Sequence, residues 1–298
     1  MSHQRLWSKK EEEDFFIKTL QIATREQLFY ITKDKRYLAY WPRNYEGKRE
    51  TLQSRNAFIG SYTEKWVKEF LEDIAKEAGA YTVQNVICGE IGLSNRSPAD
   101  VAICCTKEQV QTPENILMII EVKMSIVWNW EYNPLTGELK CIGDFTKHQG
   151  NPGLLRSDTM LKAIGKSINI RVASFKSAKI PIVIVGNTPI TLNYYEKADH
   201  LKKAGITQSF YSISPEPLDS TTHRANIKRT NANGFIRIDS YDELRTELRS
   251  LLLEKQEFFS GMKTKKELGK IIEMANKEPT YEKKAEVFLK LLKSENAQ

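Results

Sequence analysis

Cysteine and histidine are scarce, since the chain of 298 residues has four of each. No two cysteines form a Cys-x-x-Cys pair, which excludes the spacing of a zinc finger or ribbon. The histidines are scattered and include no His-Glu-x-x-His pair, so catalysis by a soft metal is disfavoured. Cys88, Cys104 and Cys105 lie in apolar stretches and are interpreted as small buried residues. This usage is typical of a reducing compartment, and we expect a cytoplasmic protein.

Glycine and proline are also few, at 15 and 10 residues, which argues against a long disordered or collagen-like chain. The longest apolar runs, residues 116–120 and 182–185, are as long as strands and fall short of the roughly 18 residues of a membrane helix. The N-terminus lacks the apolar core of a signal peptide. We therefore expect neither secretion nor a membrane partner.

The charge balance is mildly basic, with 45 Lys and Arg against 38 Asp and Glu, a net charge of +7 and a pI of about 9.0. Such an excess permits a polyanionic partner such as nucleic acid but does not require one. Composition alone leaves that question open.

Hydrophobic periodicity predicts an α/β chain. A helix is expected at 61–79, where Ser61 and Glu64 have the spacing of a capping box. We then expect strands at 81–91, 100–105 and 116–124. A polar hairpin at 128–153, an amphipathic helix at 154–174 and a further strand at 179–186 are expected to follow. The order strand, helix, strand favours parallel pairing. Other helices are expected at 10–24, 241–259 and 264–292.

The helix at 154–174 is predicted to pack through one apolar stripe. Its members are Leu155, Met160, Leu161, Ile164, Ile168 and Val172. The chain shows no internal repeat and no clear linker, so one elaborated α/β core with helical additions is the simplest account.

Two charged residues end the apolar strand at 116–124. Strand alternation places Glu121 and Lys123 on one face and Val122 on the other. Burying charges costs several kcal/mol per ion, on the order of the desolvation penalty, unless a partner compensates. A solvated strand end is the simple alternative.

Asp100 opens the preceding apolar strand, and adjacent strands could bring its carboxylate beside that of Glu121. Two carboxylates at short range repel each other unless a cation lies between them. Oxygen ligands without a His or Cys cluster favour a hard divalent cation, with Mg²⁺ as the first choice. The carbonyl of Val122 could add a ligand, and Lys123 could hold a water molecule or offset charge on a phosphate.

Asp100 followed by Glu121-Val122-Lys123 resembles the signature of the PD-(D/E)XK nucleases. The core of that family is a helix, a three-strand meander, a second helix and a further parallel strand. The resemblance covers residues 61–187 and implies a restriction-endonuclease-like core, a central mixed β-sheet flanked by helices. Residues 1–60 would be a helical N-terminal extension, and residues 188–298 a DNA-contacting and helical region packed on the core.

The match has one departure and one open position. The Pro-Asp dipeptide of the family is here Pro98-Ala99-Asp100, with one residue inserted. Many members carry a further acid on the first core helix, which makes Glu64 a candidate metal ligand. Glu64 could equally be a capping-box carboxylate, and Glu90 competes for the same role.

The resemblance implies Mg²⁺-dependent hydrolysis of DNA phosphodiester bonds that leaves 5′-phosphate ends. Asp100 and Glu121 would bind the metal, and Lys123 would position the water. The leading interpretation is a type II restriction endonuclease that acts as a homodimer on double-stranded DNA. A repair nuclease or junction resolvase of the same fold is one alternative. A non-catalytic DNA-binding protein, with Glu121 and Lys123 as a structural ion pair, is another.

Base contacts are expected from two segments outside the core elements, residues 128–153 and 221–237. The second segment is poor in acids and rich in Arg, Lys and Asn. A solvated surface loop is the alternative for any single residue. The candidate DNA-binding residues are Lys147, His148, Gln149, Arg224, Asn226, Lys228, Arg229 and Asn231.

Overall fold

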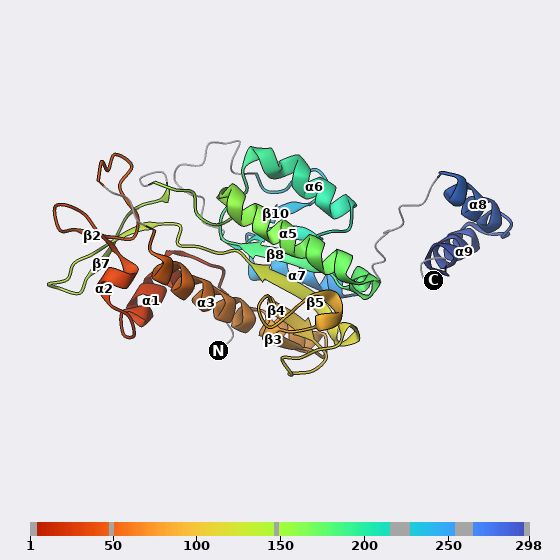
Figure 1. Cartoon of the computed structure of the whole chain (residues 1–298), viewed down its shortest axis with the longest axis horizontal. Coiled ribbons are helices and arrows are strands. Elements are labelled where there is room, and N and C mark those ends of the chain that lie inside the picture. The colour runs from red at the N-terminus through yellow and green to blue at the C-terminus, as the bar shows by residue number, and fades with distance from the viewer. Residues whose placement is uncertain (1–4, 48–50, 146–148, 215–226, 254–264, 295–298) are drawn as a thin grey trace. The chain divides into compact units, whose positions relative to one another are not determined.

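The computed structural model describes residues 5–47, 51–145, 149–214, 227–253 and 265–294 (Figure 1). The chain divides into two compact units, Met1–Glu257 and Phe258–Gln298. The described part of the second unit is a pair of helices that pack on each other, α8 (Lys265–Ala275) and α9 (Tyr281–Ser294). The sequence predicted a helix over 264–292, and the structure interrupts it between these two. Among the described residues, no helix is both long and apolar enough to cross a bilayer.

A six-stranded mixed sheet forms the centre of the first unit, with strand order β10-β9-β8-β5-β4-β3. Strands β3, β4 and β5 form an antiparallel meander, and β8, β9 and β10 continue the sheet in parallel. The strands are β3 (Tyr81–Val86), β4 (Ala99–Cys104), β5 (Ile116–Val122), β8 (Ile182–Gly186), β9 (Ser209–Ser212) and β10 (Phe235–Arg237). The predicted parallel pairing of the strand after the long helix is confirmed, because β8 pairs with β5.

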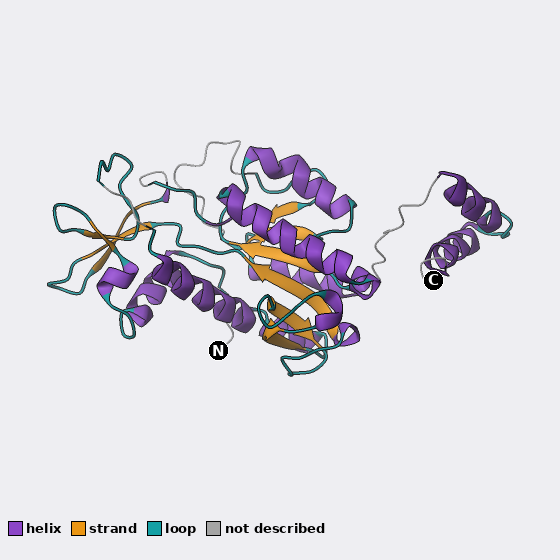
Figure 2. Ribbon diagram, viewed as in Figure 1, coloured by secondary structure: helices purple, strands orange, loops and turns teal. Residues whose placement is uncertain are grey.

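Helices cover both faces of this sheet (Figure 2). Along β5, Met118 and Ile120 pack into the core cluster that contains Val67 of α3, whereas Ile119 packs with Ile170 of α5. One face carries α3 (Gln53–Phe70), α4 (Glu72–Glu77) and α7 (Tyr241–Leu253), and the other carries α5 (Ser157–Ala173) and α6 (Tyr195–Lys203). The predicted class, an α/β protein with a central mixed sheet between helices, is confirmed.

Two local predictions are wrong in detail. Helix α3 begins at Gln53, so Ser61 lies inside the helix and does not cap it. The buried stripe extends back to Ile59, and this continuation keeps the earlier residues helical. Cys88 and Cys104 are buried as predicted, but Cys105 is exposed because it follows the last residue of β4.

A second, four-stranded antiparallel sheet has the order β1-β2-β6-β7. The hairpin expected within 128–153 supplies β6 (Asn129–Tyr132) and β7 (Leu139–Gly143). The N-terminal region supplies β1 (Tyr30–Ile31) and β2 (Tyr37–Leu38) beside its helices α1 (Lys9–Thr19) and α2 (Arg25–Leu28). The N-terminal extension is therefore not purely helical, because it completes this sheet.

Glu12 of α1 fixes the chain just beyond the end of β5. Its carboxylate is fully buried and accepts hydrogen bonds from the backbone N–H of Val127 (2.6 Å) and Trp128 (3.2 Å) and from the indole N–H of Trp130 (3.1 Å). Burial outweighs these donors and raises the pKa of Glu12 to about 8. One acidic side chain thus joins the N-terminal helix to the segment that follows the central strand.

We predict that Glu12 makes the protein less stable as the pH rises. The pKa of this carboxyl is about 8 in the folded state and ordinary in the unfolded state. Its contribution to the free energy of unfolding is therefore largest below pH 4.5. That contribution is lost as the pH rises through 8. Relative to Glu12→Gln, the wild type should lose on the order of 3 kcal/mol of unfolding free energy between pH 5 and pH 8. Urea unfolding followed by tryptophan fluorescence measures this difference, and identical pH dependence in both proteins would contradict it.

Candidate functional site

Two neighbouring strand ends bring Asp100 and Glu121 together. In the antiparallel register of β4 and β5, Val101 lies opposite Ile120, so Asp100 falls opposite Glu121 one step further on. Asp100 Oδ2 also accepts a hydrogen bond from the backbone N–H of Val122 at 2.8 Å. Glu121 is fully buried and Asp100 is largely buried. The sheet therefore holds both carboxylates side by side within the protein.

Lys123 lies against both carboxylates, on the same face as Glu121, as strand alternation predicts. Its Nζ is 3.0 Å from Asp100 Oδ2 and 3.2 Å from Glu121 Oε2. The same ammonium donates to the carbonyl oxygen of Val122 at 3.1 Å. Three oxygens, from two side chains and one peptide group, thus surround one positive charge.

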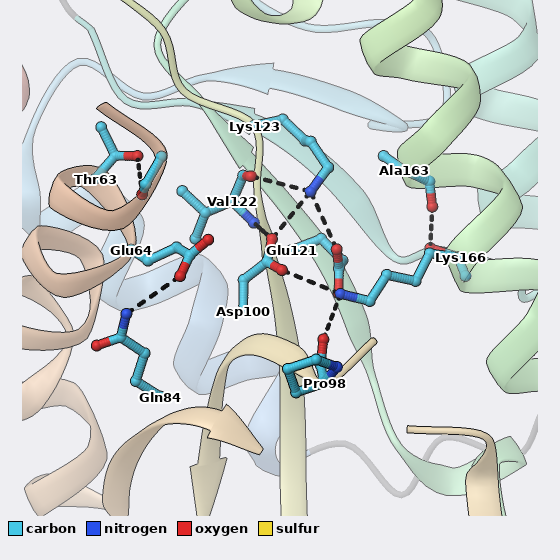
Figure 3. Close-up of polar contacts among 12 residues, drawn as sticks. Thr63, Glu64, Gln84, Pro98, Asp100, Glu121, Val122, Lys123, Ala163 and Lys166 are labelled. Carbon is cyan, nitrogen blue, oxygen red and sulfur yellow. Dashed lines mark hydrogen bonds and ion pairs between the residues drawn. The ribbon is translucent and has the colours of Figure 1, made fainter. Parts of the chain in front are cut away.

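A second lysine, Lys166 of α5, approaches the same carboxylates from the helix (Figure 3). Its Nζ lies 3.1 Å from Asp100 Oδ1 and 2.7 Å from Glu121 Oε1, and it donates to the carbonyl of Pro98 at 2.6 Å. Each ammonium group therefore contacts one oxygen of Asp100, one oxygen of Glu121 and one backbone carbonyl. The result is a compact cluster of two negative and two positive side chains.

The sequence analysis missed Lys166 because it assigned the wrong buried face to α5. The predicted stripe included Leu161, Ile168 and Val172, all of which are exposed. The buried positions are Met160, which the stripe included, and Ala163, Ser167 and Ile170, so two of the four are small. Lys166 is three residues after Ala163 and four before Ile170, in phase with this face. A lysine aligned with small buried residues was the signal that could have identified it.

Burial and charge interactions shift the pKa values of the two carboxyls in opposite directions. Burial, followed by the nearby charge of Asp100, raises the pKa of Glu121. For Asp100, burial raises the pKa, but attraction to Lys123 and Lys166 outweighs burial and leaves the pKa lowered. Burial likewise opposes the charge of Lys123, but its two carboxylate neighbours outweigh burial and raise its pKa. Asp100 and Lys123 are therefore a stable ion pair, and Glu121 is the member that protonates first.

The two further candidate acids differ in their surroundings. Glu64 is in the middle of α3, where its carboxylate points toward the strand end at Asp100 and accepts a hydrogen bond from Gln84 at 3.2 Å (Figure 3). Burial, followed by repulsion from Asp100, raises the pKa of Glu64. Glu90 instead lies on the surface and forms an ion pair with Lys176. Of the two, Glu64 is the acid whose pKa is affected by the charges of the cluster.

The oxygens of the cluster suit a hard cation, although its acidic side chains alone are too few to complete the coordination of a metal ion. Within the described ranges, no three Asp, Glu, His or Cys side chains converge on a common metal position. Asp100, Glu121 and the Val122 carbonyl already converge on the ammonium of Lys123 at 3.0 to 3.2 Å. Mg²⁺ is commonly held by one or two carboxylates and keeps several waters. The donor set therefore fits a partly hydrated Mg²⁺ ion.

Four of the eight candidate DNA-binding residues belong to the part of the chain that the structure describes. Lys147, His148, Arg224 and Asn226 lie outside the described residues. Gln149 donates to the carbonyl of Arg43 at 2.7 Å, and Asn231 is exposed.

Two of the basic candidates are neutralised by acids from elsewhere in the chain. Lys228 pairs with Asp239 at 2.8 Å and with Glu243 at 2.7 Å, and Arg229 lies 3.8 Å from the other oxygen of Glu243. The segment 221–237 is poor in acids along the sequence, but acids from outside it pair with these two basic residues in the folded structure.

No known protein family, no curated protein and no solved structure matches this chain.

We predict that Lys166→Met destabilises the protein and that Mg²⁺ restores stability. Without the lysine, the buried Glu121 Oε1 loses the ammonium group that lies 2.7 Å from it, which should cost on the order of 1–3 kcal/mol. A divalent cation bound by the same carboxylates would replace the missing charge, so MgCl₂ should raise the melting temperature of Lys166→Met more than that of the wild type.

Lys162→Met is the matched control, because Lys162 lies one turn earlier on α5 and its side chain is 72% exposed. Thermal unfolding with and without MgCl₂ should leave this variant close to the wild type. Equal behaviour of the two variants would show that Lys166 does not compensate the carboxylates.

Proposed function

We propose that the chain is a Mg²⁺-dependent nuclease that hydrolyses phosphodiester bonds of DNA, with a restriction-endonuclease-like core. The proposal is carried by the juxtaposition of Asp100 and Glu121 on adjacent strand ends with Lys123 beside both. The order of elements supports it, since a helix, an antiparallel meander, a second helix and a parallel strand surround this cluster. These are the parts that the resemblance to PD-(D/E)XK nucleases requires.

Each residue of the cluster has a chemical role in this proposal. Asp100, Glu121 and the Val122 carbonyl would hold Mg²⁺, and Glu64 would face its water shell. When bound, the metal supplies Lewis-acid activation of the scissile phosphate. Lys123 would donate hydrogen bonds to a water molecule or a phosphate oxygen. Lys166 would keep the carboxylates close together and offset their charge.

Within this class, we favour a type II restriction endonuclease that acts on a specific double-stranded sequence. One cluster of this kind cuts one strand, so cleavage of both strands requires two copies of the chain, and we propose a homodimer. A repair nuclease or junction resolvase would share the cluster but require a distorted or branched substrate.

The direct test is digestion of plasmid and branched DNA with MgCl₂, followed by mapping of the ends. We expect fixed cut positions on plain duplex DNA and 5′-phosphate termini. Asp100→Asn and Lys123→Ala should each lower the cleavage rate at least about 100-fold, because each removes charge stabilisation at the reacting phosphate.

Asp14→Asn and Lys65→Ala make the same chemical changes at exposed positions on α1 and α3 and should cleave normally. Undiminished cleavage by Asp100→Asn would refute the site. Cleavage confined to branched DNA would favour the resolvase interpretation. If the folded wild type cleaves no DNA with MgCl₂, the cluster is a structural ion network.

A further inference from the structure

Arg55 of α3 is a buried cation that lies against two aromatic rings. Only 3% of its surface is exposed, and its Nη1 has no hydrogen-bond partner. No carboxylate of the described residues pairs with it. Its guanidinium lies instead over two rings, 5.0 Å from the centroid of Tyr30 and 4.8 Å from that of Tyr40. Cation–π contacts offset part of the cost of burial but leave the N–H groups of Nη1 unsatisfied.

Arg55 lines a cavity of about 650 Å³ whose described walls are largely polar. The described lining contains two arginines and neither aspartate nor glutamate; Arg156 pairs with Asp158 of the same helix at 3.5 Å, which leaves Arg55 as the positive charge of the lining. Hydroxyl and amide groups make up much of the remainder, and they include Thr51, Asn56, Ser125, Thr159, Thr191 and Asn193. Positive charge with neutral donors and no carboxylate is the chemistry that receives an anion.

The N-terminus of α5 opens into the same cavity. Ser157 and Thr159 of its first turn line the wall, and the side chain of the N-cap residue Arg156 makes no capping hydrogen bond. A helix of 17 residues presents unpaired backbone N–H groups and the positive end of its dipole at this point. Two independent features, a buried arginine and a helix N-terminus, therefore favour negative charge in one place.

The cavity adjoins the candidate nuclease site. Met124 and Ser125, which follow Lys123 directly, are part of its wall. Gly60 of α3 also lines it and lies one helical turn before Glu64. A nucleic-acid strand whose phosphate lies at the Asp100 and Glu121 cluster would therefore place a flanking phosphate near this cavity.

We propose that this cavity is a phosphate-binding site, in which Arg55 and the N-terminus of α5 hold the anion. The site takes a phosphate monoester, a phosphodiester or inorganic phosphate. Its identification as the seat of a DNA backbone phosphate that flanks the cut rests on the proposed function.

Inorganic phosphate tests the anion site without DNA. At matched ionic strength, phosphate should raise the melting temperature of the wild type by a few degrees relative to chloride. Arg55→Met should lose this rise. Arg36→Met, which removes the same charge from an exposed arginine paired with Glu131, should keep it.

A labelled DNA duplex in EDTA tests the source of the phosphate, because binding is then measured without cleavage. By fluorescence anisotropy, Arg55→Met should weaken binding about 10-fold. It should also reduce the slope of log K against log salt by about one, as expected for one lost phosphate contact. Arg55→Lys keeps the charge without the guanidinium fork and should bind with intermediate affinity. If Arg55→Met does not fold, Arg55→Lys serves as the test. We expect this variant to bind the duplex more weakly than the wild type at an unchanged melting temperature.

The outcomes separate this proposal from the nuclease proposal. Arg55-dependent duplex binding supports a DNA phosphate, whereas Arg55-dependent stabilisation by phosphate without duplex binding supports a free phosphate and removes the DNA function. If neither measurement depends on Arg55, the phosphate site is wrong even where plasmid cleavage occurs.

Discussion

The contact between two buried carboxylates and two ammonium groups is the interaction on which the rest of the site depends. Asp100 and Glu121 are held together by strand pairing, and their repulsion would open the sheet edge without a counter-charge. One ammonium comes from the strand itself, at Lys123, and the other from α5, at Lys166. Because Lys166 bridges both acids and the Pro98 carbonyl, the cluster fixes the position of α5 relative to β4 and β5. Loss of one partner would leave a buried charge uncompensated, which is far more costly than loss of an exposed pair.

The sequence predicted the strand half of this cluster and missed the helix half, for a physical reason. A strand has a period of two, so placing Glu121 and Lys123 on one face needs no knowledge of packing. A meander makes neighbours of consecutive strands, which brought Asp100 to Glu121. In α5, large apolar side chains occur around the helix, and the face turned to the sheet was decided by close approach at Ala163 and Ser167. Which face of α5 packs on the sheet depends on the whole fold, and Lys166 can be assigned to the cluster only once that face is known.

Counting charges along the chain was equally misleading about where positive charge is available. Residues 227–237 contain no acid, yet Lys228 and Arg229 are matched by acids from beyond the segment. Arg55 drew no attention in the sequence, but it is a buried arginine that pairs with no carboxylate of the described residues. An exposed ion pair contributes little and gives up its partner readily. A buried guanidinium with unsatisfied N–H groups favours an anion far more strongly.

The location of the cluster supports the proposed reactive site over a purely structural network of ion pairs. Ion pairs that serve only stability can be replaced by apolar side chains without loss, so their position in a fold is not constrained. This cluster lies where the carboxyl ends of the parallel strands β5 and β8 meet, the edge at which open α/β sheets bind their ligands. The residues that continue β5 beyond Lys123 form the wall of the acid-free cavity. Negative oxygens suited to a cation and a positive cavity suited to an anion thus lie side by side. A metal-dependent reaction of a phosphodiester requires both a cation site and an anion site, whereas a structural ion network requires neither.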